Sequence, residues 1–246
     1  MRALDLFCGA GGASMGLYNA GFDVVGVDIK PQPNYPFKFH RADALAFPLD
    51  GFDLIWASPP CQAFTAYRRN KNRVRPALNL IPATRERLSG KNFIIENVVG
   101  APLEDPVQLC GSSFGLNIRR HRLFETSFNV DAPPCDHSWQ TPRFPPASNR
   151  KNLRSTVEVG AWRVPLATQQ EAMGIDWMTV AELSQAIPPA YSEFLAKEIV
   201  WGTTGTAPLT EQTRRERNAR KKSALRHIEK QSVVCVGTPT AVANTL

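Results

Sequence analysis

A cysteine that follows two prolines is the best candidate for covalent chemistry in this sequence. Cys61 comes after Pro59 and Pro60, directly beyond the apolar run 53–57, and is followed by Gln62. Two prolines stiffen the backbone and fix the direction of the next side chain, which suits a nucleophile that must be held at a set distance from an electrophile. Taken alone, such a cysteine is also compatible with a small buried apolar residue.

The segment 66–75 beyond this cysteine contains five cations and no acid. The cations are Arg68, Arg69, Lys71, Arg73 and Arg75. Nearby cations lower the pKa of a thiol, and the thiolate is its reactive form. The same cations can bind phosphates. We therefore expect a reactive Cys61 thiol beside a segment that binds the nucleic-acid backbone.

Two further motifs bring charge to strand-like segments. Glu96 ends the apolar run 93–95, where burial raises the pKa of a carboxyl and lets it donate as well as accept a proton. Arg120 and Arg122 alternate just before another strand-like step, so both can point into one site. A surface cluster of charge is the alternative for the two arginines.

A glycine loop stands between a strand-like run, residues 2–7, and a helical pattern that resumes at residue 15. Such a loop lets a ligand approach the backbone, and Asp28, which ends the next strand-like run, can accept hydrogen bonds from ribose hydroxyls. The run 9–14 lacks the last glycine of the dinucleotide fingerprint, so a nucleoside without a pyrophosphate fits at least as well as NAD or FAD. Asp43 follows another candidate strand and can contact an adenine amino group. A plain tight turn remains the alternative for the loop.

These motifs all lie at the ends of short buried strands separated by segments of helix length. That order predicts an α/β domain with a mainly parallel sheet, and such sheets bind ligands at the carboxyl ends of their strands. From about 126 to 160 the composition changes to Pro, Asn, Ser and Arg, which indicates a small irregular second lobe. Helical patterns return at 171–174 and 181–199, and a basic segment follows residue 202.

Composition excludes several classes of protein. The 246 residues are 43% hydrophobic, which argues against wholesale disorder, and no run approaches the ~20 apolar residues of a membrane span. An acid at position 5 is unlike a signal peptide, so we expect a cytoplasmic protein with no membrane partner. The net charge is +7, but residues 203–246, with eight basic and three acidic residues, supply most of it. The charge of the body alone is therefore weak evidence for a polyanionic ligand.

Cysteine spacing argues against a metal. The five cysteines form no C-x-x-C pair, which disfavours both a disulfide framework and a paired zinc site. Cys135 and His137 are two candidate ligands without a second pair nearby. We therefore predict that the protein binds no metal.

The motifs at 5–12, 59–62 and 96–98 and the pair Arg120-x-Arg122 occur in the order and rough spacing of the DNA (cytosine-5) methyltransferase family. The chain resembles a compact member with a short target-recognition region. The likeness covers 1–125 and resumes at about 165–200, where 167–172 and 185–190 look like the family's closing motifs. There the chain has Ser184-Gln185 where the family usually has Gly-Asn.

The resemblance implies a Rossmann-like, S-adenosylmethionine-dependent methyltransferase fold, divided into a catalytic and cofactor-binding domain (1–125), a recognition lobe (126–165), a completing segment (166–202) and a flexible basic tail (203–246). It implies that Cys61 adds to carbon 6 of a flipped-out cytosine, so that carbon 5 accepts the methyl group, while Glu96 binds the ring nitrogen and Arg122, with Arg120, orients the base. The implied cofactor residues are Asp5, Phe7, Cys8, Gly9, Ala10, Gly11, Gly12, Asp28, Ile29, Asp43, Ala44, Pro59, Gln185 and Ala186. The implied DNA contacts are Gln62 and the five cations of 66–75.

The resemblance further implies double-stranded DNA as partner, a monomer, and a cognate restriction endonuclease as a possible functional partner. Two alternatives stay open: an RNA (tRNA) cytosine-5 methyltransferase, since the base chemistry is the same, and a nucleic-acid-binding relative without turnover. The intact set of catalytic residues favours an enzyme. A recognition lobe of about 40 residues can read only a short or degenerate site, or must rely on phosphate contacts.

Overall fold

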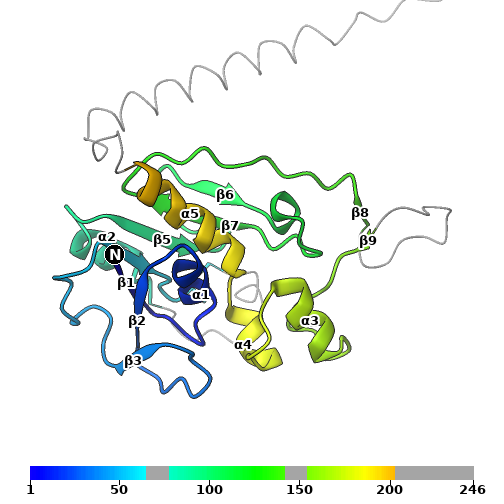
Figure 1. Cartoon of the computed structure of the whole chain (residues 1–246), viewed down its shortest axis with the longest axis horizontal. Coiled ribbons are helices and arrows are strands. Elements are labelled where there is room, and N and C mark those ends of the chain that lie inside the picture. The colour runs from blue at the N-terminus through cyan, green and yellow to red at the C-terminus, as the bar shows by residue number, and fades with distance from the viewer. Residues whose placement is uncertain (65–77, 142–153, 203–246) are drawn as a thin grey trace, which may run out of the picture. The chain divides into compact units, whose positions relative to one another are not determined.

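The computed structural model describes residues 1–64, 78–141 and 154–202 (Figure 1). The described residues all belong to one compact unit within residues 1–208, and residues 209–246 lie outside them. The basic segment 66–75 and the basic tail, both singled out from the sequence, also lie outside them. Among the described helices, none is long and apolar enough to cross a membrane.

A seven-stranded sheet forms the centre of this compact unit, with the strand order β3-β2-β1-β4-β5-β7-β6. The strands are β1 (Arg2–Leu6), β2 (Asp23–Asp28), β3 (Lys38–Arg41), β4 (Leu54–Ala57), β5 (Phe93–Asn97), β6 (Val107–Leu109) and β7 (Arg122–Thr126). The first five strands along the chain pair in parallel, β7 runs antiparallel to β5, and β6 runs antiparallel to β7. The prediction of a mainly parallel sheet is confirmed.

The helices are α1 (Gly12–Asn19), α2 (Ile81–Arg87), α3 (Leu166–Met173), α4 (Val180–Gln185) and α5 (Pro189–Gly202), with a 3-10 turn η3 (Gly111–Phe114). Figure 1 shows α1 and α5 side by side. Their backbones come so close that a Cβ on Gly16 would lie 2.1 Å from the carbonyl oxygen of Pro189, which only glycine avoids. Ser192 also donates a hydrogen bond to the Ala13 carbonyl at 2.8 Å. The last described helix therefore completes the layer begun by the first.

Apolar side chains cover both faces of the sheet. On one face, Trp56 and Phe124 pack with Tyr191 and Leu195 of α5. The other face has its own apolar cluster, built from alternate residues of the same strands and from Leu88 beyond α2. Strands of a parallel sheet that are buried on both faces form continuous apolar runs in the sequence. For this reason β1, β2, β4 and β5 could be predicted from the apolar runs alone.

The remaining strands were harder to predict. Strand β6 has three residues, and β8 (Gln140–Thr141) and β9 (Arg154–Ser155) pair in a separate two-stranded parallel sheet. The sequence pattern places no strand in these segments, because two or three residues show no periodicity. Helix α3 begins at Leu166, five residues before the predicted helical pattern.

Candidate active site

The candidate site lies where the strand order reverses, between β1 and β4. Open α/β sheets bind ligands at such a switch point, outside the carboxyl ends of the strands. Leu6 is in register with Val27 and with Ala57, and Ala57 is in register with Ile95. The next residues along each strand therefore reach one edge of the sheet together: Phe7, Asp28, Ser58 and Glu96. We call residues 7–14 and 28–30 the glycine-loop side, and residues 58–62, 96–97 and 120–122 the cysteine side.

The end of β5 holds the proline pair that precedes Cys61. Asn97 donates from Nδ2 to the Pro59 carbonyl at 2.9 Å, and its Oδ1 accepts from the Val98 amide at 2.9 Å. Because Asn97 is buried, this contact ties the turn after β4 to the neighbouring strand. Cys61 itself is half-buried, and its carbonyl accepts from the Phe64 amide at 2.9 Å. The cysteine is thus positioned from two strands.

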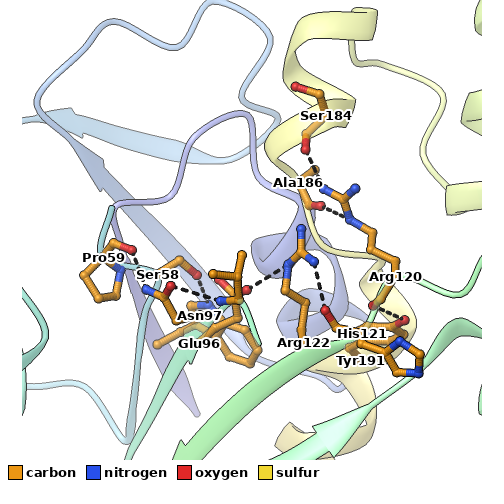
Figure 2. A network of polar contacts seen from close by, with 12 residues as sticks. Ser58, Pro59, Glu96, Asn97, Arg120, His121, Arg122, Ser184, Ala186 and Tyr191 are labelled. Carbon is orange, nitrogen blue, oxygen red and sulfur yellow. Dashed lines mark hydrogen bonds and ion pairs between the residues drawn. The ribbon is translucent and has the colours of Figure 1, made fainter. Parts of the chain in front are cut away.

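Glu96 is the buried acid of the cysteine side, with 7% of its surface exposed. Its Oε1 lies 3.3 Å from Nε of Arg122 (Figure 2). Ser58 also hydrogen-bonds its carboxyl. Burial raises the pKa of Glu96, and the charge of Arg122 and the Ser58 hydrogen bond oppose that rise without cancelling it. As the sequence predicts, this carboxyl is able to carry a proton.

The pKa of the Cys61 thiol is raised, whereas the sequence predicts a lowered one. Burial and the neighbouring Glu96 carboxylate raise its pKa, although Arg122 and Arg120 pull it down. Among the described residues the pKa of the thiol is thus raised, whereas the cations of 66–75, from which we predict a lowered pKa, lie outside them. Part of the rise comes from the negative charge of Glu96, so protonation of Glu96 favours the Cys61 thiolate. The two groups are electrostatically coupled.

Arg120 and Arg122 have different partners. Whereas Arg122 pairs with Glu96, Arg120 donates from Nε to the Ala186 carbonyl at 2.8 Å and from Nη2 to the Ser184 carbonyl at 2.7 Å (Figure 2). Arg120 has a positive φ of 23° and precedes the regular part of β7, so the simple alternation expected for a strand does not hold there. Burial and the charge of Arg122 lower the pKa of Arg120 to about 9. The structure thus ties Arg120 to the closing segment of the chain.

On the glycine-loop side, backbone amides hold Asp28. Its Oδ2 accepts from the Gly9 amide at 3.1 Å and its Oδ1 from the Lys30 amide at 2.9 Å. A Cβ on Gly9 would meet no atom within 4 Å, so open space lies beside the loop. Ile29 is 66% exposed next to the carboxylate. Acceptor oxygens, open backbone and an apolar side chain suit the ribose and base of a nucleoside cofactor.

Asp5 and Cys8 lie beneath the loop, buried away from solvent. One oxygen of Asp5 accepts from Ser14, whereas the other has no hydrogen-bond partner, and burial raises the pKa of Asp5 to about 7. Burial also raises the pKa of the Cys8 thiol. Both side chains are shielded from solvent, and Asp5 contacts the first turn of α1 through Ser14.

Tyr35 was missed by the sequence analysis. Its hydroxyl lies 2.8 Å from Ser14 Oγ, and a Cβ on Gly26 would lie 2.2 Å from the Tyr35 ring. The Tyr35 ring also lies against Gly11. A glycine within the β-branched run of β2 is the one sequence signal of this close approach, because glycine within a strand often marks a neighbour that comes close.

The other predicted cofactor residues surround the loop. Ala10 accepts a hydrogen bond at its carbonyl from Trp177 Nε1 at 2.8 Å, which links the loop to the segment after α3. Ala186 contacts the position of a Cβ on Gly12, and Gln185 ends α4 with its side chain exposed. Asp43 is exposed and accepts from the Leu45 amide, whereas Ala44 is buried.

For the predicted DNA contacts, the structure describes only Gln62, which is exposed. The other five lie outside the described residues.

The premise of the metal prediction is wrong. The sequence offered Cys135 and His137 without a second pair of ligands nearby, yet the fold brings Cys110 and His121 beside them. The four come from three segments that are distant along the chain, which no spacing rule detects.

Comparisons with known proteins agree with this geometry. A family model described as C-5 cytosine-specific DNA methylase matches residues 1–105. The chain is 29% identical over 121 residues to the type II methyltransferase M.AgeI of Thalassovita gelatinovora. That match covers 41% of this chain and spans about a quarter of the relative's length, 28%.

Solved structures share the fold. A prophage-encoded E. coli protein described as a DNA modification methyltransferase aligns with a TM-score of 0.55 at 15% identity, covering 84% of this chain and all of that one. The Dnmt2 methyltransferase of S. pombe aligns with a TM-score of 0.52 at 13% identity, covering 82% of this chain and 99% of that one. The predicted Rossmann-like methyltransferase fold is confirmed.

Proposed function

We propose that this chain methylates carbon 5 of cytosine in DNA through a covalent adduct of Cys61, because residues 1–105 match the family model described as C-5 cytosine-specific DNA methylase. The observation that supports this best is the buried Glu96–Arg122 pair, whose charge acts directly on the Cys61 thiol. A binding module without turnover has no need of a buried acid that is coupled to a cysteine. The proposal therefore favours catalysis over binding alone.

The first step is addition of the Cys61 sulfur to carbon 6 of the cytosine. The new C–S bond pushes electron density through the ring, so that carbon 5 becomes enamine-like and nucleophilic. Negative charge develops at ring nitrogen 3, and a protonated Glu96 can supply a proton there, because its pKa is raised. As Glu96 gives up this proton, Arg122 stabilises the resulting carboxylate.

S-Adenosylmethionine, when bound, supplies the methyl group that carbon 5 accepts. The residues that fit it are Asp28, whose two oxygens keep free lone pairs beside backbone amides, the open face of Gly9, and the exposed Ile29. These groups match ribose hydroxyls and an apolar base. After methylation, carbon 5 loses its proton to a water molecule, ring nitrogen 3 returns its proton to Glu96, and the Cys61 sulfur leaves carbon 6 as a thiolate, which restores the aromatic ring and the free enzyme.

A stacked base exposes neither carbon 6 nor its ring nitrogen to these side chains, so the cytosine must leave the stack. Similarity to a type II methyltransferase supports a role in marking DNA against a cognate restriction endonuclease. The match covers 28% of that relative, so this role belongs to the proposal and has to be tested in cells that carry the nuclease.

Trapping of the adduct tests the proposal. A duplex in which every cytosine is 5-fluorocytosine covers all target sequences, and fluorine at carbon 5 blocks the elimination step. With S-adenosylmethionine, we expect a covalent complex that survives denaturation, with the Cys61 peptide as its attachment point. Cys61→Ser should form none while it still binds the cofactor, whereas Cys8→Ala should form it.

An RNA of the same sequence is the matched arm for the substrate class. Faster trapping on RNA than on DNA would replace the DNA proposal with an RNA methyltransferase. Absence of an adduct on both, with intact cofactor binding, would contradict the covalent mechanism.

A further inference from the structure

Four potential metal ligands converge beside β6 and β7. Cys110 directly follows β6, His121 directly precedes β7, and Cys135 and His137 lie in the loop before β8. One ligand atom from each residue lies within 4.8 Å of the ligand atoms of the other three. We propose that these four side chains bind one zinc ion.

Two of the ligand separations are close to those of tetrahedral coordination. The Cys110 Sγ lies 3.2 Å from His137 Nε2, and the Cys135 Sγ lies 3.4 Å from His121 Nε2. A tetrahedral zinc ion with Zn–S near 2.3 Å and Zn–N near 2.05 Å holds neighbouring sulfur and nitrogen ligands about 3.5 Å apart. Small side-chain adjustments around an ion would therefore suffice.

Polar groups outside the cluster hydrogen-bond the sulfur atoms of both cysteines. Ser112 donates from its hydroxyl to the Cys110 sulfur at 3.2 Å, and Gln108 Nε2 lies 4.0 Å from the Cys135 sulfur. Donors of this kind stabilise metal-bound thiolates. In the absence of an ion, the Cys110 thiol donates to the Arg119 carbonyl at 2.9 Å. Metal binding takes the place of that proton, so two thiol protons leave for each ion bound.

The donor set identifies the metal and its role. Two thiolates and two neutral imidazoles balance the charge of a divalent cation, and sulfur with imidazole ligands selects zinc over magnesium or calcium. Four protein ligands leave no open position for water or substrate. A closed site of this kind stabilises the fold and takes no part in the chemistry.

The proposed zinc site shares a segment of backbone with the candidate active site. His121 lies between Arg120, which binds the closing segment, and Arg122, which pairs with Glu96. Figure 2 shows the His121 ring directed away from the Arg122 guanidinium. An ion bound to His121 would hold the backbone that carries both arginines, and through Cys135 and His137 it would attach the start of the recognition lobe to the catalytic sheet.

Metal content of the full-length chain tests this proposal independently of methylation. Protein purified under reducing conditions without added metal should contain one zinc ion per chain, measured by inductively coupled plasma mass spectrometry. Replacement by Co²⁺ should give the absorption of a tetrahedral cobalt site, including thiolate-to-cobalt charge transfer. These signals do not depend on the proposed reaction, so failure of one proposal leaves the other intact.

Two variants distinguish loss of a zinc ligand from unfolding of the chain. Cys135 is exposed, so Cys135→Ser should fold but lose the zinc and the charge-transfer band, whereas Cys61→Ser should keep both. A chelator should lower the unfolding temperature of the unsubstituted protein and leave that of Cys135→Ser unchanged.

Three results would overturn the zinc site. They are the absence of zinc together with no cobalt charge transfer in reduced protein, retention of stoichiometric zinc after Cys135→Ser and His137→Gln together, and a Cys110–Cys135 disulfide in protein isolated with its thiols trapped.

Discussion

The glycine-loop side and the cysteine side each place a carboxylate at the end of a strand, but they hold it in different ways. Asp28 is fixed by two backbone amides, from Gly9 and Lys30. Glu96 is fixed by side chains, from Arg122 and Ser58, and it is almost fully buried. Backbone donors orient acceptor oxygens toward a ligand, whereas burial together with a coupled cation controls where a proton resides. The first side therefore serves binding, and the second serves chemistry.

The largest effect is expected from loss of the Glu96 proton. Glu96→Gln keeps the shape of the side chain and removes its acid function, so kcat should fall by a factor of about 10² or more, the usual contribution of a positioned acid. Single-turnover methylation measures this rate, and calorimetry should show unchanged cofactor affinity. A Glu96→Gln variant whose only defect is DNA affinity would show that Glu96 takes no part in the chemical step.

The pH dependence of that variant sharpens the assignment. Because burial raises the pKa of Glu96, its proton is present at low pH and lost as the pH rises through the raised pKa. The unsubstituted enzyme should show a descending limb of kcat at high pH that reports this loss. Glu96→Gln should lack that limb, and an identical limb in both proteins would assign it to another group.

Arg122 should act through Glu96. Arg122→Met removes the cation that stabilises the Glu96 carboxylate, so kcat should fall by a factor of about 10, as for loss of a hydrogen bond to a charged group. The double variant with Glu96→Gln should be no slower than Glu96→Gln alone. Additive losses would show that Arg122 acts on the substrate independently of Glu96.

Arg120→Met is the matched control for Arg122→Met. It should lower the free energy of unfolding, because Arg120 loses its hydrogen bonds to the carbonyls of Ala186 and Ser184.

On the glycine-loop side, Asp28→Ala should weaken cofactor binding with little change in kcat. Loss of acceptor oxygens for ribose should raise the Michaelis constant for S-adenosylmethionine by about 10-fold, as expected for a hydrogen bond to a charged group. Asp23→Ala, at the exposed opposite end of the same strand, is the control and should leave the constant unchanged. Equal effects of the two substitutions would remove Asp28 from the cofactor site.

The last prediction concerns stability, and it is expected to have no effect on the comparison of rates. The pKa of Asp5 is about 7 in the folded protein against 3.8 as its ordinary value, so the native state binds the extra proton between these values. Stability from this group is therefore present at low pH and is lost as the pH rises toward 7, by at most about 4 kcal/mol. Asp5→Asn removes the titration and should flatten the fall in unfolding free energy between pH 4 and 8, measured with urea. An unchanged slope would contradict a protonated Asp5.

Local patterns were enough to predict much of the fold and the cysteine side. Apolar runs located β1, β2, β4 and β5 because strands buried on both faces are continuously apolar. The prolines before Cys61 and the acid that ends β5 were visible as local sequence. Each of these features depends on residues close together in the chain.

Contacts between distant segments could not be predicted. Arg120 binds carbonyls more than 60 residues away, and Tyr35 approaches Ser14 across 21 residues of sequence, with Gly26 as the one local signal. The cluster around Cys110 assembles from three segments, so spacing rules written for paired ligands did not detect it. The pKa of the Cys61 thiol could not be predicted either, because it depends on how the fold buries the thiol and on Glu96, which is 35 residues away in the sequence.

The contact between Gly16 and Pro189 has a consequence for synthesis of the chain. Helix α1 emerges from the ribosome early, yet the apolar face that it shares with Trp56 stays uncovered until Tyr191 and Leu195 have been translated. About 170 further residues are therefore translated before α1 can pack against α5. We expect nascent chains that stop before α5 to expose this surface and to bind chaperones, and the matched region 1–105 to aggregate when it is expressed alone.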